Sequence, residues 1–431
     1  MTSESNGSNI PDRPELRPVE VSRISHEGSD YFLLKDLRRL SDQSLMVPAP
    51  LGLYLQGADG TNTLNEIVQE ALSKGAPEVA PETLDDLMSR LDEMYLLANG
   101  KYEAEIEHRL SEYREAPFRE PALAGLAYPE DLEDLRGYLD GFAFPYMIED
   151  VRADDDLPAD LDVELNALIS PHIDFERGGD SYGMIWEQVR HDLQDVELFV
   201  VFGTDHNGAG PRLTLTNQNY QTPIGELETD TDLVDDIARI LSTDSEVDDH
   251  PFADEFNHVN EHSIELASVW LHRALGASNA KMLPILCGSF GPLLQDGAPN
   301  IDDHPQINRV ISLLRSVAKE RKTVFIAAAD LAHVGPAFGD EEEIPKDSEV
   351  RKRVQVEDEN LLESITRGSR RSFLESIKKN NDQNKICGLA PIYMTLWAAD
   401  VTTGIWNGYQ QCQADENDTS FVSIASAALF G

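Results

Sequence analysis

Four short apolar runs follow one another through the second half of the chain, and longer stretches of helical character separate them. The runs cover residues 165–170, 197–203, 281–288 and 323–329. Strands that are buried on both faces read as continuous apolar runs, and strands separated by helices are typical of a parallel sheet. The alternation therefore predicts an α/β fold, with a mostly parallel sheet and flanking helices, for the larger part of the chain.

The length of 431 residues exceeds what one average domain uses, so we expect more than one folded unit. Residues 1–19 lack the basic start and apolar centre of a signal peptide and are expected to be a disordered N-terminus. Residues 20–107 form the first predicted domain, and the charged residues 108–120 are predicted to be a linker helix. The second predicted domain then covers residues 121–431.

The first predicted domain combines small helices with strand-like flanks, which indicates a winged-helix-like unit. Thr63 and Glu66 have the spacing of a capping box, and Thr83 precedes a second helix with apolar residues at helical spacing. The order of an apolar stretch and two helices resembles the small PqqD-like peptide-recognition domains. These parts lie at 36–60, 63–72 and 87–102. A structural cap or a dimerisation unit is the alternative interpretation.

The composition excludes several classes of partner. Acidic residues number 79 and basic residues 35, for a net charge of −44, which repels phosphate backbones and anionic membrane surfaces. No apolar run approaches the ~18 residues that span a bilayer. Three cysteines spread over a long chain do not suit a disulfide framework. We expect a cytoplasmic protein that binds neither nucleic acid nor membranes.

Histidines follow three of the predicted strands within a polar cluster. They are His172, His206 and His333, and ligands of parallel α/β sheets gather at the carboxyl ends of strands. Imidazole is the commonest transition-metal ligand, and neighbouring carboxylates can bind the metal or fix the tautomer of the ring. The pattern therefore predicts a metal site. Without a metal, the same cluster suits general acid–base chemistry, because imidazole titrates near neutrality.

A further histidine belongs to a helix rather than to a strand end. Asn260 precedes the helix, Gly276 follows it, and His262 is expected in the first turn. The G-x-S-x-G pattern of hydrolase nucleophiles also occurs, at residues 179–183. That motif requires a strand running directly into the turn, whereas the preceding predicted strand ends at Ser170. We therefore do not expect a serine hydrolase.

Six motifs occur in the order seen in the Memo family, and the chain resembles that family over residues 121–431. More closely, it is similar to the B proteins of the AmmeMemoRadiSam system, some of which carry an extra N-terminal domain. The motifs are PHIDFERGG at 171–179, GTDHNG at 203–208, YQTPIGEL at 220–227, EHSIE at 261–265, DLAHVG at 330–335 and CGLAPI at 387–392.

The resemblance implies a fold similar to the catalytic subunit of class III extradiol dioxygenases, which hold non-haem iron between two histidines and a glutamate. In Memo proteins the corresponding cluster is two histidines and a cysteine, which fall here on His172, His206 and Cys387. A thiolate is softer than a carboxylate, so this set favours iron or copper, with zinc as an alternative divalent metal. It also implies a redox-sensitive thiol.

The resemblance further implies a metal-dependent oxidoreductase, or a redox accessory protein, that acts beside a radical SAM enzyme and an AMMECR1-like protein on a small-molecule or peptide ligand. His333 or His262 would move protons, and Asp330 would orient a histidine. Two alternatives stay open. One is an aromatic-ring dioxygenase that uses Asp205 or Asp330 as its carboxylate ligand. The other is a non-catalytic module that retains the pocket and binds a peptide.

Overall fold

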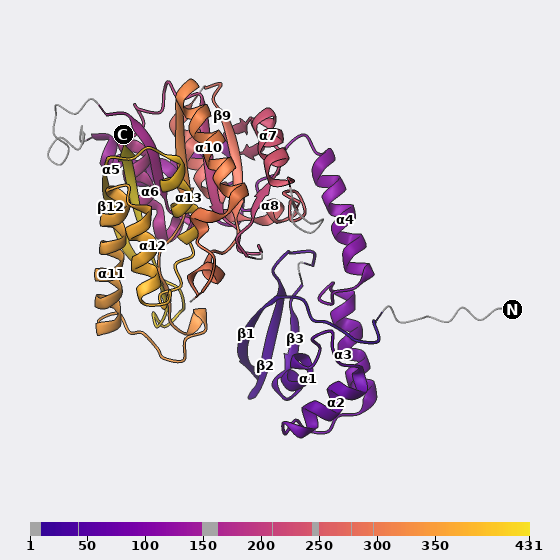
Figure 1. Cartoon of the computed structure of the whole chain (residues 1–431). Coiled ribbons are helices and arrows are strands. Elements are labelled where there is room, and N and C mark those ends of the chain that lie inside the picture. Colours follow the sequence, from indigo (N-terminus) through magenta and orange to yellow (C-terminus); the bar gives the residue numbers. More distant parts are fainter. Residues whose placement is uncertain are drawn as a thin grey trace. The chain divides into compact units, whose positions relative to one another are not determined.

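The computed structural model describes residues 10–41, 43–148, 163–208, 210–243, 250–276, 278–295 and 297–431. The chain forms two compact units that divide between Glu115 and Ala116 (Figure 1). The predicted linker at 108–120 spans this division, and the helix α4 (Gly100–Glu115) covers its first part. The domain boundaries given above stay predictions.

The N-terminal unit contains a three-stranded antiparallel sheet in the order β1-β2-β3, followed by short helices. Residues 1–9 of the expected disordered start lie outside the described residues, whereas Leu16 already donates a backbone hydrogen bond to Ala58. The winged-helix interpretation also stays a prediction. The elements are β1 (Val19–His26), β2 (Ser29–Asp36), β3 (Leu45–Pro48), α1 (Gly52–Gln56), α2 (Leu64–Ser73), α3 (Pro81–Glu93) and α4.

The helix starts of this unit test the capping predictions. The capping box is confirmed at α2, where the Glu66 carboxylate accepts from the backbone N–H of Thr63 at 2.8 Å. The start predicted for the next helix, directly after Thr83, is wrong by three residues, because α3 begins at Pro81. Proline is favoured in the first turn of a helix, where its missing N–H would have no partner.

The second unit is built on an eight-stranded sheet in the order β11-β13-β4-β10-β5-β9-β6, with β12 paired to β13. The four strands predicted from the apolar runs are β4, β5, β9 and β10, and they pair in parallel. The remaining pairs are antiparallel. The strands are β4 (Leu165–Ser170), β5 (Leu198–Thr204), β6 (Leu213–Leu215), β9 (Lys281–Cys287), β10 (Thr323–Ala328), β11 (His333–Val334), β12 (Thr403–Gln413) and β13 (Phe421–Phe430), and β7 (Tyr220–Thr222) pairs with β8 (Gly225–Leu227) outside this sheet.

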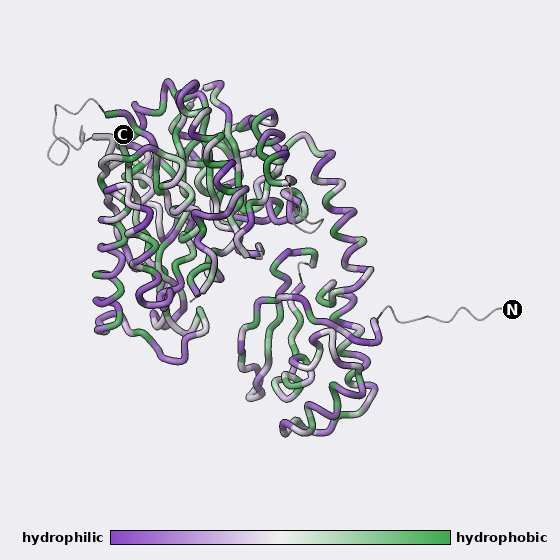
Figure 2. The backbone as a smooth tube through the Cα atoms, in the orientation of Figure 1, coloured by the Kyte–Doolittle hydropathy of each residue, from purple (hydrophilic) through white to green (hydrophobic). Residues whose placement is uncertain are grey.

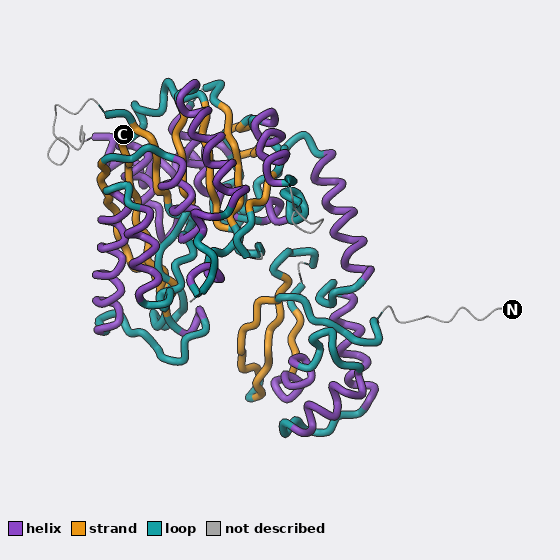
Figure 3. The backbone as a smooth tube through the Cα atoms, viewed as in Figure 1, coloured by secondary structure: helices purple, strands orange, loops and turns teal. Residues whose placement is uncertain are grey.

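Helices cover both faces of this sheet, so the unit has three layers (Figures 1 and 3). In β5, Phe199 and Val201 pack toward α6 and α9, whereas Val200 and Phe202 pack toward α10 and α13. All four side chains are buried, which explains why the strand reads as a continuous apolar run. Figure 2 shows the central strands mostly in green and the outer helices in alternating purple and green.

The helices of the second unit divide between the two faces of the sheet. The first layer holds α5 (Leu132–Ile148), α6 (Phe175–Gln188) and α9 (His262–Leu275), and the second holds α7 (Thr231–Leu241), α10 (Pro305–Glu320), α11 (Glu349–Thr366), α12 (Arg370–Lys379) and α13 (Leu389–Ala398). The short helix α8 (Asn257–Asn260) precedes α9. Among the described helices, none is long and apolar enough to cross a bilayer.

The G-x-S-x-G pattern lies within α6 and not at a turn after a strand. Its Ser181 side chain is fully buried beside Ser426 on β13, with 3.4 Å between the two hydroxyl oxygens. A nucleophile elbow needs a serine exposed on a sharp turn at the end of a strand. The structure therefore agrees with the expectation that this motif is not a hydrolase site.

Candidate metal centre

Three polar side chains follow the parallel strands at the same distance from the strand end. His172, His206 and Asp330 each lie two residues beyond the last residue of β4, β5 and β10. Because β10 lies between β4 and β5, the three residues reach the same edge of the sheet. His172 and His206 lie next to each other there, with their ring centroids 5.1 Å apart.

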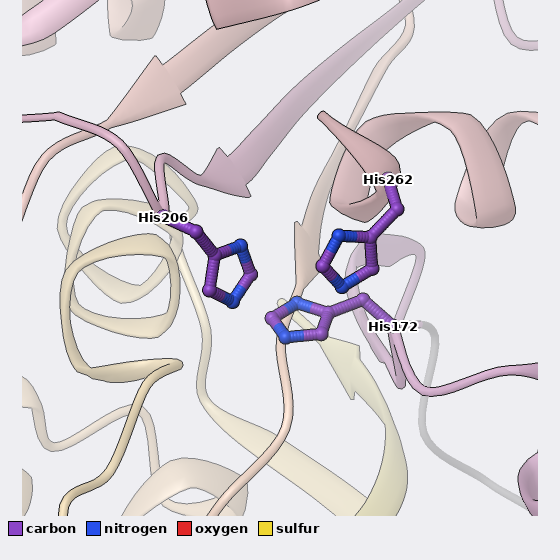
Figure 4. Close-up of side chains that lie close together, drawn as sticks. All are labelled: His172, His206 and His262. Carbon is purple, nitrogen blue, oxygen red and sulfur yellow. The ribbon is translucent and has the colours of Figure 1, made fainter. Parts of the chain in front are cut away.

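A third imidazole joins this pair from the first residue of α9. The ring of His262 lies 5.3 Å from that of His172 and stacks on that of His206 at 4.7 Å (Figure 4). One nitrogen of each ring lies within 4.8 Å of the corresponding nitrogens of the other two. Imidazoles grouped in this way could hold a metal ion, so the structure adds His262 to the predicted pair of histidine donors.

Hydrogen bonds at Nδ1 orient all three rings. The Nδ1 of His172 lies 2.9 Å from the carbonyl oxygen of Ala328, which can only accept. The Nδ1 atoms of His206 and His262 lie 3.0 and 3.1 Å from the carboxylate of Glu261. Each Nδ1 therefore carries the proton, and Nε2 is left as the nitrogen available to a metal.

Cys387 lies beside His172 and also interacts with His206. Its Sγ is 3.3 Å from His172 Nε2 and 3.8 Å from the backbone oxygen of Asp330. The next residue must be small: a Cβ at Gly388 would lie 2.4 Å from the Asp330 oxygen. Burial raises the pKa of the Cys387 thiol, but the neighbouring His172 and His333 imidazoles lower it well below its usual value. These neighbours therefore favour the thiolate form of the side chain.

The surroundings shift the pKa values of the three imidazoles in different directions. Burial lowers the pKa of His172, but Asp330 and Cys387 outweigh it and raise the value to about 9. His206 is also raised, because Glu261 outweighs burial. For His262, burial is the dominant cause and the pKa is lowered. In the metal-free protein, two of the three rings therefore bind an extra proton more readily than a free imidazole does.

Asp330 and His333 border the group without belonging to it. One oxygen of Asp330 accepts the backbone N–H of His172 at 2.8 Å, and the other lies 3.7 Å from His172 Nε2. His333 begins β11, and its Nδ1 lies 3.2 Å from the carbonyl oxygen of Leu331. Burial lowers the pKa of His333, but the Cys387 thiolate raises it above the usual value. His333 therefore interacts mainly with the sulfur, which is larger in its effect on the pKa than the charge of His172.

Asp205, proposed above as a possible carboxylate ligand, is engaged elsewhere. Both of its carboxylate oxygens lie 3.0 Å from the side-chain nitrogen of Asn257, and one also accepts the backbone N–H of Asn207. The residue is almost completely buried, which raises its pKa to about 6. It is absent from the group of donors that could hold a metal among the described residues.

Sequence reasoning missed Glu261. The residue is the N-cap of α9, where its carboxylate accepts the backbone N–H of Ser263 at 3.0 Å. The prediction placed the start of this helix after Asn260, one residue too early. A glutamate at a helix start directly before a histidine was visible in the sequence. The sequence did not show that this carboxylate contacts His206, which lies 55 residues earlier in the chain.

A family model described as Memo-like protein matches residues 119–428. A MEMO1 family protein of Aquifex aeolicus is 23% identical over 360 residues, which cover 83% of this chain and 84% of that protein. A MEMO1 family protein of Thermus thermophilus is 25% identical over a match that covers 74% of this chain and 85% of that protein. The memo-1 homolog of Caenorhabditis elegans is 25% identical over a match that covers 54% of this chain and 61% of that protein. The Aquifex match is longer than residues 116–431 and so extends into the N-terminal unit.

Proposed function

The chain belongs to the Memo-like protein family, and we propose that its second unit binds one divalent transition metal through His172, His206 and Cys387, with His262 as a further donor. The observation that carries this proposal is the grouping of three imidazoles, each with a ring nitrogen within 4.8 Å of the others, whose Nδ1 atoms all contact hydrogen-bond acceptors. A metal cation is the simplest partner for three imidazoles grouped in this way.

The distance between Cys387 and His172 suits such a donor set. Metal–nitrogen bonds of ~2.0 Å and metal–sulfur bonds of ~2.3 Å place two donors of a tetrahedral site about 3.5 Å apart. The separation of 3.3 Å between Cys387 Sγ and His172 Nε2 is close to this value. A mixed set of imidazole and thiolate favours iron or copper, with zinc as the alternative, over magnesium or calcium.

We further propose that the protein is a metal-dependent oxidoreductase or a redox accessory protein. A bound transition metal would supply Lewis-acid or one-electron chemistry at this edge of the sheet. Asp330 would hold the backbone of His172 in place, as its 2.8 Å hydrogen bond supports. His333, beside the Cys387 sulfur, would exchange protons with groups on that side of the site.

The proposal also concerns the proteins beside which this chain acts. We infer a place beside a radical SAM enzyme and an AMMECR1-like protein, with a winged-helix-like, PqqD-like N-terminal unit that recognises a peptide. Its antiparallel sheet and following helices support this proposal. Pull-downs with the full chain and with residues 116–431 test the role of the N-terminal unit: a peptide partner should bind only the full chain. Equal capture by both would contradict it.

Metal titration tests the centre. Protein isolated without added metal and loaded with zinc(II), copper(II) or iron(II) should hold one ion per chain. The double variant His172→Ala, His206→Ala should lose that ion, because two of the converging donors disappear. A matched control is His258→Ala, which removes a buried imidazole that hydrogen-bonds Tyr220 and not the cluster. Unchanged metal content in the double variant would refute the assignment.

A ring-cleaving dioxygenase is the second candidate, and Asp330 is the observation that favours it. Its second carboxylate oxygen lies 3.7 Å from His172 Nε2, close enough to complete a site of two histidines and one carboxylate after a small shift. Anaerobic loading with iron(II), followed by catechol and dioxygen, separates the two proposals. Ring opening gives a strongly coloured product, and its appearance in the wild type but not in Asp330→Asn would favour the dioxygenase.

A further inference from the structure

Glu261 occupies an unusual place beside the cluster. Its side chain is 1% exposed, and its carboxylate accepts hydrogen bonds from two backbone N–H groups, those of His206 and Ser263, both at 3.0 Å. These two bonds come from the loop after β5 and from the start of α9. The carboxylate is therefore held in position by the backbone before any side chain is considered.

The same two oxygens also reach two imidazoles. Oε1 lies 3.0 Å from His206 Nδ1 and 3.1 Å from His262 Nδ1, and Oε2 lies 3.1 Å from His206 Nδ1. The two rings stack with an angle of 19° between their planes. An ionised carboxylate only accepts hydrogen bonds, so both rings must present a proton at Nδ1. One side chain thereby fixes the tautomer and the orientation of two histidines.

We propose that Glu261 is the positioning residue of the metal centre, and that it makes His206 and His262 available to the metal as a pair. The proposal rests on the proposed function, because it assigns the two Nε2 atoms as ligands. Hydrogen bonds to the far nitrogen of a ligand histidine orient the ring and make it more basic. Here a single buried carboxylate serves two ligands from different elements.

An amide at this position would not serve both rings. Glutamine has one carbonyl oxygen and one NH₂ group, so it cannot accept from four N–H donors. An NH₂ group that faces an imidazole Nδ1 requires that nitrogen to accept. The proton of that ring then moves to Nε2, and the ring can no longer bind a metal. Glu261→Gln should therefore remove one histidine from the centre without changing the shape of the side chain.

The control lies one turn further along α9. Glu265 is equally buried, and its carboxylate accepts hydrogen bonds from the backbone of Ala122 and Leu123 and from the hydroxyl of Tyr128. It also pairs with Arg119 at 2.6 Å. Glu265→Gln removes a buried carboxylate from the same helix without touching the imidazoles. A general loss of stability would affect both variants, whereas a positioning role affects only Glu261→Gln.

Zinc(II) affinity, measured by competition with a chelator, and ¹⁵N NMR of the histidine side chains test the proposal on the full chain. We expect Glu261→Gln to bind zinc about 10- to 100-fold more weakly, and Glu265→Gln to bind it as the wild type does. In the zinc-loaded wild type, His206 and His262 should both carry their proton on Nδ1. In Glu261→Gln one of them should carry it on Nε2.

The outcomes separate this proposal from the one on which it rests. If the wild type binds zinc and Glu261→Gln binds it equally well, Glu261 has no positioning role but the metal centre stands. If the wild type binds no metal, the proposed function fails and this inference fails with it. If Glu261→Gln does not fold, the wild-type spectrum decides: a proton on Nε2 of either ring in the zinc-loaded protein overturns the proposal.

Discussion

Metal binding at this centre should release about two protons at pH ~7. His172, with a pKa of about 9, and His206 both have values above the ordinary 6.5, because neighbouring negative groups outweigh the effect of burial. Both rings are therefore protonated in the metal-free protein near neutral pH. Their Nδ1 protons are held by acceptors, so the proton that leaves is the one on Nε2, the nitrogen that a metal takes.

The other two donors contribute no proton. The lowered pKa of Cys387 favours the ionised thiol before a metal binds, and the lowered pKa of His262 favours the neutral ring. Each proton that must leave changes the binding constant by about tenfold per pH unit, so two protons give about 100-fold. The affinity should therefore fall by this factor for each unit of acidification below about pH 7. The dependence should fade as the pH rises through the His172 pKa of about 9, where that ring loses its proton unaided.

Calorimetric titration with zinc(II) in buffers of different ionisation enthalpy counts the released protons directly. Chelator competition between about pH 6 and pH 9 gives the slope of the affinity. His172→Gln should reduce the count by about one, because one protonated donor is then absent. A count near zero in the wild type, or an affinity that does not change over this range, would refute the assignment of the two raised pKa values to metal donors.

Three further predictions follow from single contacts. The copper(II)-loaded protein should show an intense thiolate charge-transfer band in its absorption spectrum, and Cys387→Ser should abolish it; a band that persists would exclude the sulfur as a ligand. Gly388→Ala should lower the melting temperature and weaken metal binding, because the added Cβ would lie 2.4 Å from the Asp330 oxygen and relieving such overlap costs ~1–3 kcal/mol; unchanged melting would show that the loop adapts freely. Burial raises the pKa of Asp358 from 3.8 to about 7, so between these pH values the folded state holds a proton that the unfolded chain has lost. The free energy of unfolding should therefore decline by about 1.4 kcal/mol per pH unit over this range because of this one group. Urea unfolding of Asp358→Asn should lack this decline, and an identical pH profile in both proteins would contradict the prediction.

The central strands were predictable because each of them is buried on both faces. Continuous apolar runs such as that of β5 arise from this burial, and their ends agree with the prediction within one residue. The antiparallel hairpin of β12 and β13 was not predicted. Its second strand holds buried serines, including Ser423 and Ser426, and its first strand is rich in polar residues. Hydropathy did not distinguish the polar β12 from a loop, whereas β13 is apolar apart from its serines, and its pairing with β12 is what the sequence did not show.

From the residue pattern alone, the site was predictable only where a residue follows a strand of the sheet, whereas Cys387, which lies beside His172, was implied by the family resemblance. His172 and His206 have this position, and so their proximity followed from the order of the elements. His262 lies at a helix start, and its approach to the other rings depends on how α9 packs on the sheet. Glu261 was missed for the same reason. Long-range packing sets its contacts, and the spacing of residues along the chain does not reveal them.

The order of strands in the sheet also determines how long β4 waits for its neighbours during synthesis. β4, which leads to His172, pairs with β10 and β13, and both are translated much later. β13 begins about 250 residues after β4 ends, which at ~5–20 residues per second corresponds to about 12–50 s. β10 is made about 150 residues after β4, and β13 follows about 90 residues after β10, so β4 first lacks both of its final neighbours and then one of them. The nascent chain therefore has to keep an apolar strand from aggregating until these late strands are made.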